Sequence, residues 1–114
     1  MTEKTEARIQ QEAFMWHWNT YPTHRKRLFM VNNNPRNEVD GNRMKAQGMI
    51  AGVSDMILLR EGRPPLCIEF KLPNGRQSPA QVAWQSVAEA TGAEYVLIRS
   101  LEEFQNLFSP DRTT

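Results

Sequence analysis

The chain has 114 residues, 39% of them hydrophobic and 24% charged, a balance typical of one soluble globular domain spanning residues 1–114. Its net charge of +1 is too small for a protein that holds nucleic acid by charge alone. No apolar run approaches the roughly 20 residues of a membrane span, and the single Cys67 excludes an internal disulfide and a cysteine-rich zinc site. With the polar N-terminus, these features predict an intracellular, cytoplasmic protein.

The first half of the chain is expected to form a helix, a strand and a short helix. Apolar residues at helical spacing predict a helix over about 3–19, which ends before Pro22. A short buried strand is expected over 28–31, followed by an asparagine-rich loop over 32–37. A second, shorter helix is expected over 39–47.

The second half contains stronger signals. Two apolar runs, 54–59 and 66–71, are separated by turn residues and predict a hairpin of paired strands. Ser78 is a typical N-cap, and Gln81 three residues later completes a capping box, so a helix begins here and ends at Gly92. The apolar stripe of this helix consists of Ala80, Ala83, Trp84, Val87 and Ala88.

The end of the chain is expected to add one strand and one helix. The continuous apolar run over 95–98 predicts a strand that is buried on both faces. Ser100 and Glu103 form a second capping box, which opens a last helix that ends at Ser109 before a frayed tail. The strand–helix–strand unit predicts a parallel crossover, so the fold class is α/β, with a central mixed β-sheet flanked by α-helices.

Three charged residues stand out at the predicted hairpin. Glu69 and Lys71 are two residues apart and therefore share one face of their strand. Pairing of the two strands would place Asp55 beside Glu69. A pair of carboxylates with the backbone carbonyl of Phe70 suits Mg²⁺ or Mn²⁺, and Lys71 could orient the water that attacks a phosphodiester. The alternative is an ordinary charge pair on a solvated strand.

The order of elements and several motifs together resemble the VRR-NUC domain, a member of the PD-(D/E)xK superfamily of restriction-endonuclease-like folds. Residues 48–55 are similar to the family's Gly-x-x-x-Gly-x-x-Asp motif, and 69–71 to its Glu-x-Lys motif. Residues 75–81 are similar to its Gly-Arg-x-Ser-Pro-x-Gln segment, and 6–10 to its Glu-x-x-Ile-Gln segment. Ser54 stands where the family usually has proline, but no charged position of the motifs is lost.

The resemblance implies roles for individual residues. Asp55, Glu69 and the carbonyl of Phe70 would hold the metal, and Lys71 would position the water and stabilise the developing charge. Glu6 would reach the site from the first helix, as a ligand or through water, unless it lies on a solvated face. Gln81 would sit beside Lys71, although its capping role competes with this function. DNA contacts are expected from Arg36, Arg43, Lys45 and Arg76.

The resemblance also implies an activity. Stand-alone members, often encoded by phages or bacteria, resemble homodimeric nucleases that resolve four-way (Holliday) junctions in DNA repair and recombination, with a divalent metal and no small-molecule cofactor. A nuclease of flaps or single strands, a nicking nuclease, or a catalytically silent nucleic-acid-binding module are the alternatives. Aromatic and apolar residues around the first helix and 20–47 exceed what one small core would need, so this region is the predicted dimer surface; they are Trp18, Tyr21, Phe29, Met30 and Met44.

Overall fold

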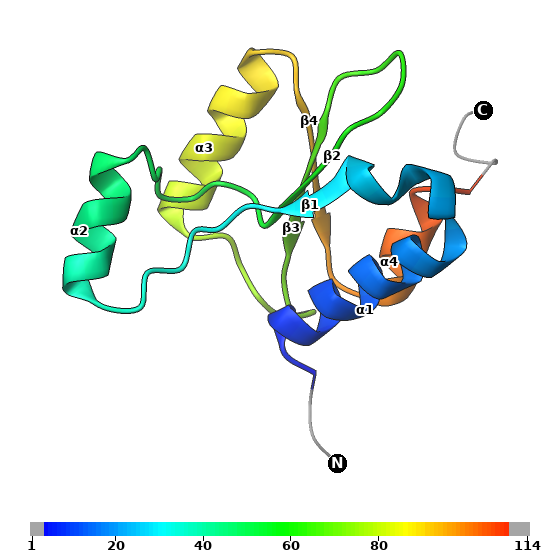
Figure 1. Ribbon diagram of the computed structural model, residues 1–114, viewed down its shortest axis with the longest axis horizontal. Coiled ribbons are helices and arrows are strands. Elements are labelled where there is room, and N and C mark those ends of the chain that lie inside the picture. The colour runs from blue at the N-terminus through cyan, green and yellow to red at the C-terminus, as the bar shows by residue number, and fades with distance from the viewer. Residues whose placement is uncertain (1–3, 110–114) are drawn as a thin grey trace.

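The computed structural model describes residues 4–109 and arranges the chain as a small sheet between helices (Figure 1). The predicted order of elements is confirmed, and a 3-10 helix that was not predicted, η1, follows the first helix. The elements are α1 (Glu6–Thr20), η1 (Pro22–Arg27), β1 (Leu28–Met30), α2 (Glu38–Ala46), β2 (Met56–Leu58), β3 (Leu66–Phe70), α3 (Pro79–Ala90), β4 (Glu94–Ile98) and α4 (Leu101–Asn106). The expected start of α1 at residue 3 and the expected frayed tail lie outside the described residues.

The four strands form one mixed sheet in the order β1-β2-β3-β4. β1 pairs with β2 and β2 with β3 in antiparallel fashion, whereas β4 lies parallel to β3. Met56, the first residue of β2, is paired with Ile68 in the middle of β3, and Leu58 is paired with Leu66, so the two strands run antiparallel as the predicted hairpin requires. Both the hairpin and the parallel crossover through α3 are therefore confirmed.

One face of the sheet carries the hydrophobic core. α1 and α4 lie together over this face, while α3 lies on the opposite side (Figure 1). Ile9 and Ala13 of α1 and Phe104 of α4 are at most 3% exposed. The strand residues buried against them are Leu28, Met56, Leu58, Leu66, Ile68, Phe70 and Ile98.

The face that α3 covers is less completely buried than expected. Of the predicted apolar stripe on α3, only Ala88 is buried, and Val87 remains 59% exposed. Tyr95, Val96 and Leu97 of β4 are half-buried, so the prediction of a strand buried on both faces is wrong. The reason is topological, since β4 is an edge strand and a single helix packs over its second face.

The loop before β2 passes very close to the first turn of α3. Gly52 has a φ of 87°, and a Cβ atom built there would lie 2.2 Å from the carbonyl oxygen of Ala80. Only glycine combines this backbone conformation with this approach. The loop that leads into Asp55 is thereby fixed against the start of α3.

Among residues 4–109, no helix is long and apolar enough to cross a membrane.

Candidate active site

Asp55 lies immediately before the first residue of β2, at the end of the sheet where β3 terminates. Its carboxylate oxygen Oδ2 accepts a hydrogen bond of 2.7 Å from the backbone N–H of Phe70. This bond fixes Asp55 beside the Glu69–Lys71 segment, the neighbourhood that strand pairing predicts. The side chain of Phe70 is fully buried in the core, and the proposed role of its carbonyl stays a prediction.

Glu69 and Lys71 lie on the α3 side of the sheet, opposite the hydrophobic core. Both are buried, Glu69 to 1% and Lys71 to 8% exposure. A solvated charge pair on an open strand, the alternative interpretation of this motif, does not fit such burial. Lys71 forms no ion pair with a carboxylate in the described part of the chain.

The electrostatics of Glu69 are strongly perturbed. Burial, followed by the neighbouring negative charge of Asp55, raises the pKa of Glu69 to about 8. The positive charge of Lys71 acts in the opposite direction without cancelling the effect. The positive charge near the two carboxyl groups is therefore too small to keep both of them ionised at neutral pH. Strongly perturbed carboxyls of this kind are enriched at functional sites.

Gln81 caps α3 and also contacts the buried carboxyl of Glu69, while its expected role beside Lys71 stays a prediction. Its side-chain oxygen accepts a hydrogen bond of 2.8 Å from the backbone N–H of Ser78, and the Ser78 hydroxyl accepts one from the N–H of Gln81, which confirms the capping box. Its side-chain nitrogen donates a hydrogen bond of 3.0 Å to Oε2 of Glu69. Gln81 therefore joins the start of α3 to the buried carboxyl.

Sequence reasoning missed Tyr95 and Gln77, which complete this network. The Tyr95 hydroxyl donates a hydrogen bond of 3.4 Å to Oε1 of Glu69, and the Gln77 amide donates one of 3.3 Å to Tyr95. Burial and the charge of Glu69 raise the pKa of Tyr95, so its hydroxyl keeps the proton that it donates. The alternation of side chains along strands could have revealed Tyr95. It pairs with Cys67, which lies two residues from Glu69 and therefore on the same face of the sheet.

Arg99 was also missed, although it fixes the turn that follows Lys71. Its guanidinium donates hydrogen bonds of 2.7 Å to the carbonyls of Leu72 and Gly75. Glu6 of α1 lies next to this turn, since a Cβ atom on Gly75 would be 3.7 Å from its carboxylate. Within residues 4–109 no three acidic, histidine or cysteine side chains gather closely enough to hold a metal. The role expected of Glu6, as a ligand or through water, stays a prediction.

The basic residues expected to contact DNA differ in their surroundings. Arg36, Arg43, Lys45 and Arg76 are all exposed. Arg36 and Arg43 flank the buried Asp40 and form ion pairs with it, which stabilises the start of α2. Their expected role in DNA binding, like that of Lys45 and Arg76, stays a prediction.

The donor set fits a hard divalent cation. Asp55 and Glu69 offer carboxylate oxygens, which Mg²⁺ and Mn²⁺ prefer, and a bound cation would offset the repulsion between the two carboxylates. Mg²⁺ is commonly bound through one or two carboxylates and several waters, so a third acidic ligand is not required.

Comparisons with known proteins bear on the fold. No protein-family model matches the sequence, and no curated protein matches it. A solved structure described as a "VRR_NUC domain protein" superposes with a TM-score of 0.77, covering 94% of this chain and 87% of the other at 18% identity. The expected resemblance is confirmed in three dimensions: the chain has the α/β fold of a VRR_NUC domain protein.

Proposed function

We propose that the chain is a divalent-metal-dependent DNA endonuclease. The observation that carries this proposal is the convergence of half-buried Asp55 with buried Glu69 and Lys71 at one end of the sheet. Phosphodiester hydrolysis needs positive charge beside the phosphate and an oriented water, and these residue types supply both. The structural similarity to a VRR_NUC domain protein supports the same class of activity.

Each residue has a role that follows from its contacts. Asp55 and Glu69 would hold Mg²⁺ or Mn²⁺, which when bound would polarise the phosphate and lower the pKa of a coordinated water. Lys71, which has no carboxylate partner within the described residues, is available to hold the water and to stabilise negative charge developing on the phosphate. Gln81 and Tyr95 orient the Glu69 carboxyl through its two oxygens.

We further propose that the substrate is branched DNA and that the active form is a homodimer. A two-fold dimer presents two identical sites, which suits paired cuts at a four-way junction. A groove of about 590 Å³ supports the predicted dimer surface, because Trp18, Phe29 and Met30 line it and are 39–62% exposed. Tyr21 does not line this groove and packs against Trp16 and Phe108, so its place in the dimer surface stays a prediction.

Cleavage of a labelled synthetic four-way junction tests the proposal. The protein is assayed with Mg²⁺, with Mn²⁺ and with EDTA, against flap, single-stranded and linear duplex controls. Asp55→Asn and Lys71→Met are each expected to reduce cleavage by about 10²–10³-fold or more, while the far-ultraviolet circular dichroism stays unchanged. Glu102→Gln, an exposed acid on α4, is the matched control and should cut like the unmodified chain.

The possible results separate the parts of the proposal. Symmetric, metal-dependent nicks near the branch point and a dimeric mass in light scattering would support a junction-resolving nuclease. Cutting of flaps or single strands alone would preserve the site and change the substrate. Full activity in Asp55→Asn or Lys71→Met would overturn the assignment of the site.

A further inference from the structure

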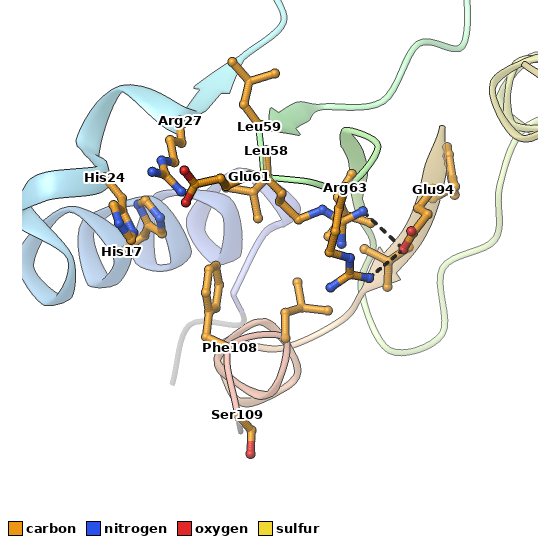
Figure 2. A pocket seen from close by; sticks show the side chains of 15 residues that line it. His17, His24, Arg27, Leu58, Leu59, Glu61, Arg63, Glu94, Phe108 and Ser109 are labelled. Carbon is orange, nitrogen blue, oxygen red and sulfur yellow. Dashed lines mark hydrogen bonds and ion pairs between the residues drawn. The ribbon is translucent and has the colours of Figure 1, made fainter. Parts of the chain in front are cut away.

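A cavity lies at the opposite end of the sheet from the proposed active site at Asp55 and Lys71. It has a volume of about 790 Å³ and opens between η1, the β2–β3 hairpin and the end of α4 (Figure 2). Leu58 and Leu66, which line it, stand at the hairpin end of their strands, whereas Asp55 and Lys71 stand at the other end. The five residues of β3 alone separate the two sites by roughly 16 Å. The cavity is therefore distinct from the proposed active site.

Positive charge gathers around this cavity. Arg27, Arg60 and Arg63 line it together with two acids, Glu61 and Glu94. Glu94 pairs with Arg60 and Arg63 at 3.2 Å each, and Arg60 is further held by the carbonyl of Pro64. Arg27 forms no ion pair within residues 4–109, although Figure 2 shows the Glu61 carboxylate on the same side of the cavity. The guanidinium of Arg27 is thus available to an anion.

A histidine ring also faces this cavity. His17 is 2% exposed, lines the cavity beside His24, and makes no side-chain hydrogen bond within the described residues (Figure 2). No buried side-chain nitrogen or oxygen in this part of the chain lacks a partner, so the ring nitrogens of His17 reach the open space of the cavity. Burial, followed by the charges of His24 and Arg27, lowers the pKa of His17. A ligand in the cavity would therefore meet a neutral imidazole that can form a hydrogen bond with it.

The cavity also offers an apolar wall. Phe108 and Leu107 of the C-terminal segment and Val96 of β4 line it together with the two leucines of the hairpin strands. Its volume lies within the range of about 300–1,000 Å³ that is typical of small-molecule pockets. A ligand with a phosphate group and a flat apolar part would match the basic rim and the aromatic wall together.

We propose that this cavity binds a nucleotide, with its phosphate held by Arg27 and His24, which lie on the same side of the cavity (Figure 2), and its base against Phe108. The nucleotide is either free or part of a DNA strand, since both present the same chemistry. Binding here does not depend on whether the chain cuts DNA, because the cavity shares no residue with the proposed active site.

The test uses the full chain in EDTA and follows its two histidines by nuclear magnetic resonance. The probes are thymidine 5′-monophosphate, a short oligothymidylate and inorganic phosphate, and a His24→Asn variant assigns the two imidazole signals. The expected result is saturable movement of both signals with thymidine monophosphate and a rise in the pKa of His17. Tighter binding of the oligonucleotide would identify a DNA strand as the source, and tighter binding of the mononucleotide a free nucleotide.

Matched variants separate this pocket from diffuse attraction. Arg27→Gln should weaken binding about tenfold, the loss expected for one charged hydrogen bond. Lys26→Gln removes the same charge from the neighbouring exposed residue, which does not line the cavity, and should leave binding unchanged. His24→Asn, at the other residue that would hold the phosphate, repeats the test if Arg27→Gln does not fold. Absence of histidine shifts at millimolar probe, equal losses in Lys26→Gln, or equal affinity for inorganic phosphate would overturn the proposal.

Discussion

The two faces of the sheet are built on opposite principles. The face under α1 and α4 is apolar, and Ile68, Phe70 and Phe104 there are fully buried. The face under α3 buries Glu69 and Lys71 instead, and its apolar neighbours on β4 and α3 stay half-exposed. Apolar burial stabilises the folded state at about 25 cal/mol per Å², whereas burial of a carboxyl costs free energy unless partners offset it. One face therefore supplies stability and the other uses part of it.

Hydrogen bonds limit the cost of the polar face. Both oxygens of Glu69 accept a hydrogen bond, one from Gln81 and one from Tyr95, and Asp55 accepts one from the backbone of Phe70. The pKa of Glu69 is nevertheless raised to about 8, so the network does not fully offset burial and repulsion. A strained arrangement of this kind is expected where function, and not stability, selects the residues.

The largest expected effect falls on the apolar face. Phe104→Ala should lower the free energy of unfolding by about 3–5 kcal/mol, because it leaves a cavity among three aromatic rings. These rings are Trp16, Phe70 and Phe108. Urea denaturation measures the change, and junction cleavage per folded molecule should stay near that of the unmodified chain. A loss below about 1 kcal/mol would mean that the core is elsewhere.

The second prediction concerns pH and the polar face. In EDTA, the folded chain holds a proton on Glu69 up to about pH 8, while the unfolded chain releases it near the ordinary pKa of a carboxyl. Between these values the folded state binds more protons, so stability should fall by about 1.4 kcal/mol for each unit of rising pH and level off above pH 8. Urea denaturation between pH 5 and pH 9 should show this slope, in excess of that from other groups, and Glu69→Gln should remove it.

Metal provides a check on the same variant. Millimolar Mn²⁺ should stabilise the unmodified chain, because a ligand of the folded state shifts the unfolding equilibrium, and it should stabilise Glu69→Gln much less. Equal stabilisation of both proteins would place the cation away from Glu69.

The smallest expected effect separates the two interactions of Gln81. Ser78→Ala and Gln81→Ala each break the capping box and should each lower stability by about 1 kcal/mol. Only Gln81→Ala also removes the donor to Glu69. Cleavage should therefore fall further in Gln81→Ala than in Ser78→Ala, measured at equal folded fraction. Equal cleavage rates in the two variants would mean that Gln81 acts only as part of the helix cap.

Local signals explain why much of the fold could be predicted. The Ser78 cap, the turn residues of the hairpin and the alternation of Leu66, Ile68 and Phe70 each act within a few residues, and each is confirmed. The same alternation placed Glu69 and Lys71 on one face. The 3-10 helix η1 had no comparable signal, because the basic run 24–27 has no apolar periodicity.

Contacts between distant segments explain what the sequence did not reveal. Tyr95 and Arg99 act on residues 26 and 24–27 positions away, across the parallel pairing of β3 and β4. The burial of β4 depended on its place at the sheet edge, which an apolar run does not encode. The roles assigned to Glu6, Arg36, Arg43, Lys45 and Arg76 depend on a bound metal or DNA and stay predictions.

The close approach of Gly52 to Ala80 means that the 48–55 loop and the first turn of α3 can change only together. Any side chain at position 52 would push the Asp55 loop and the first turn of α3 apart, and that turn carries Gln81. A mutation of Gly52 would therefore move two groups at once: the carboxylate of Asp55, and the side chain of Gln81 that donates a hydrogen bond to Glu69. Recombination or design that exchanges α3 for another helix would consequently have to transfer the 48–55 loop with it, as a single inherited unit.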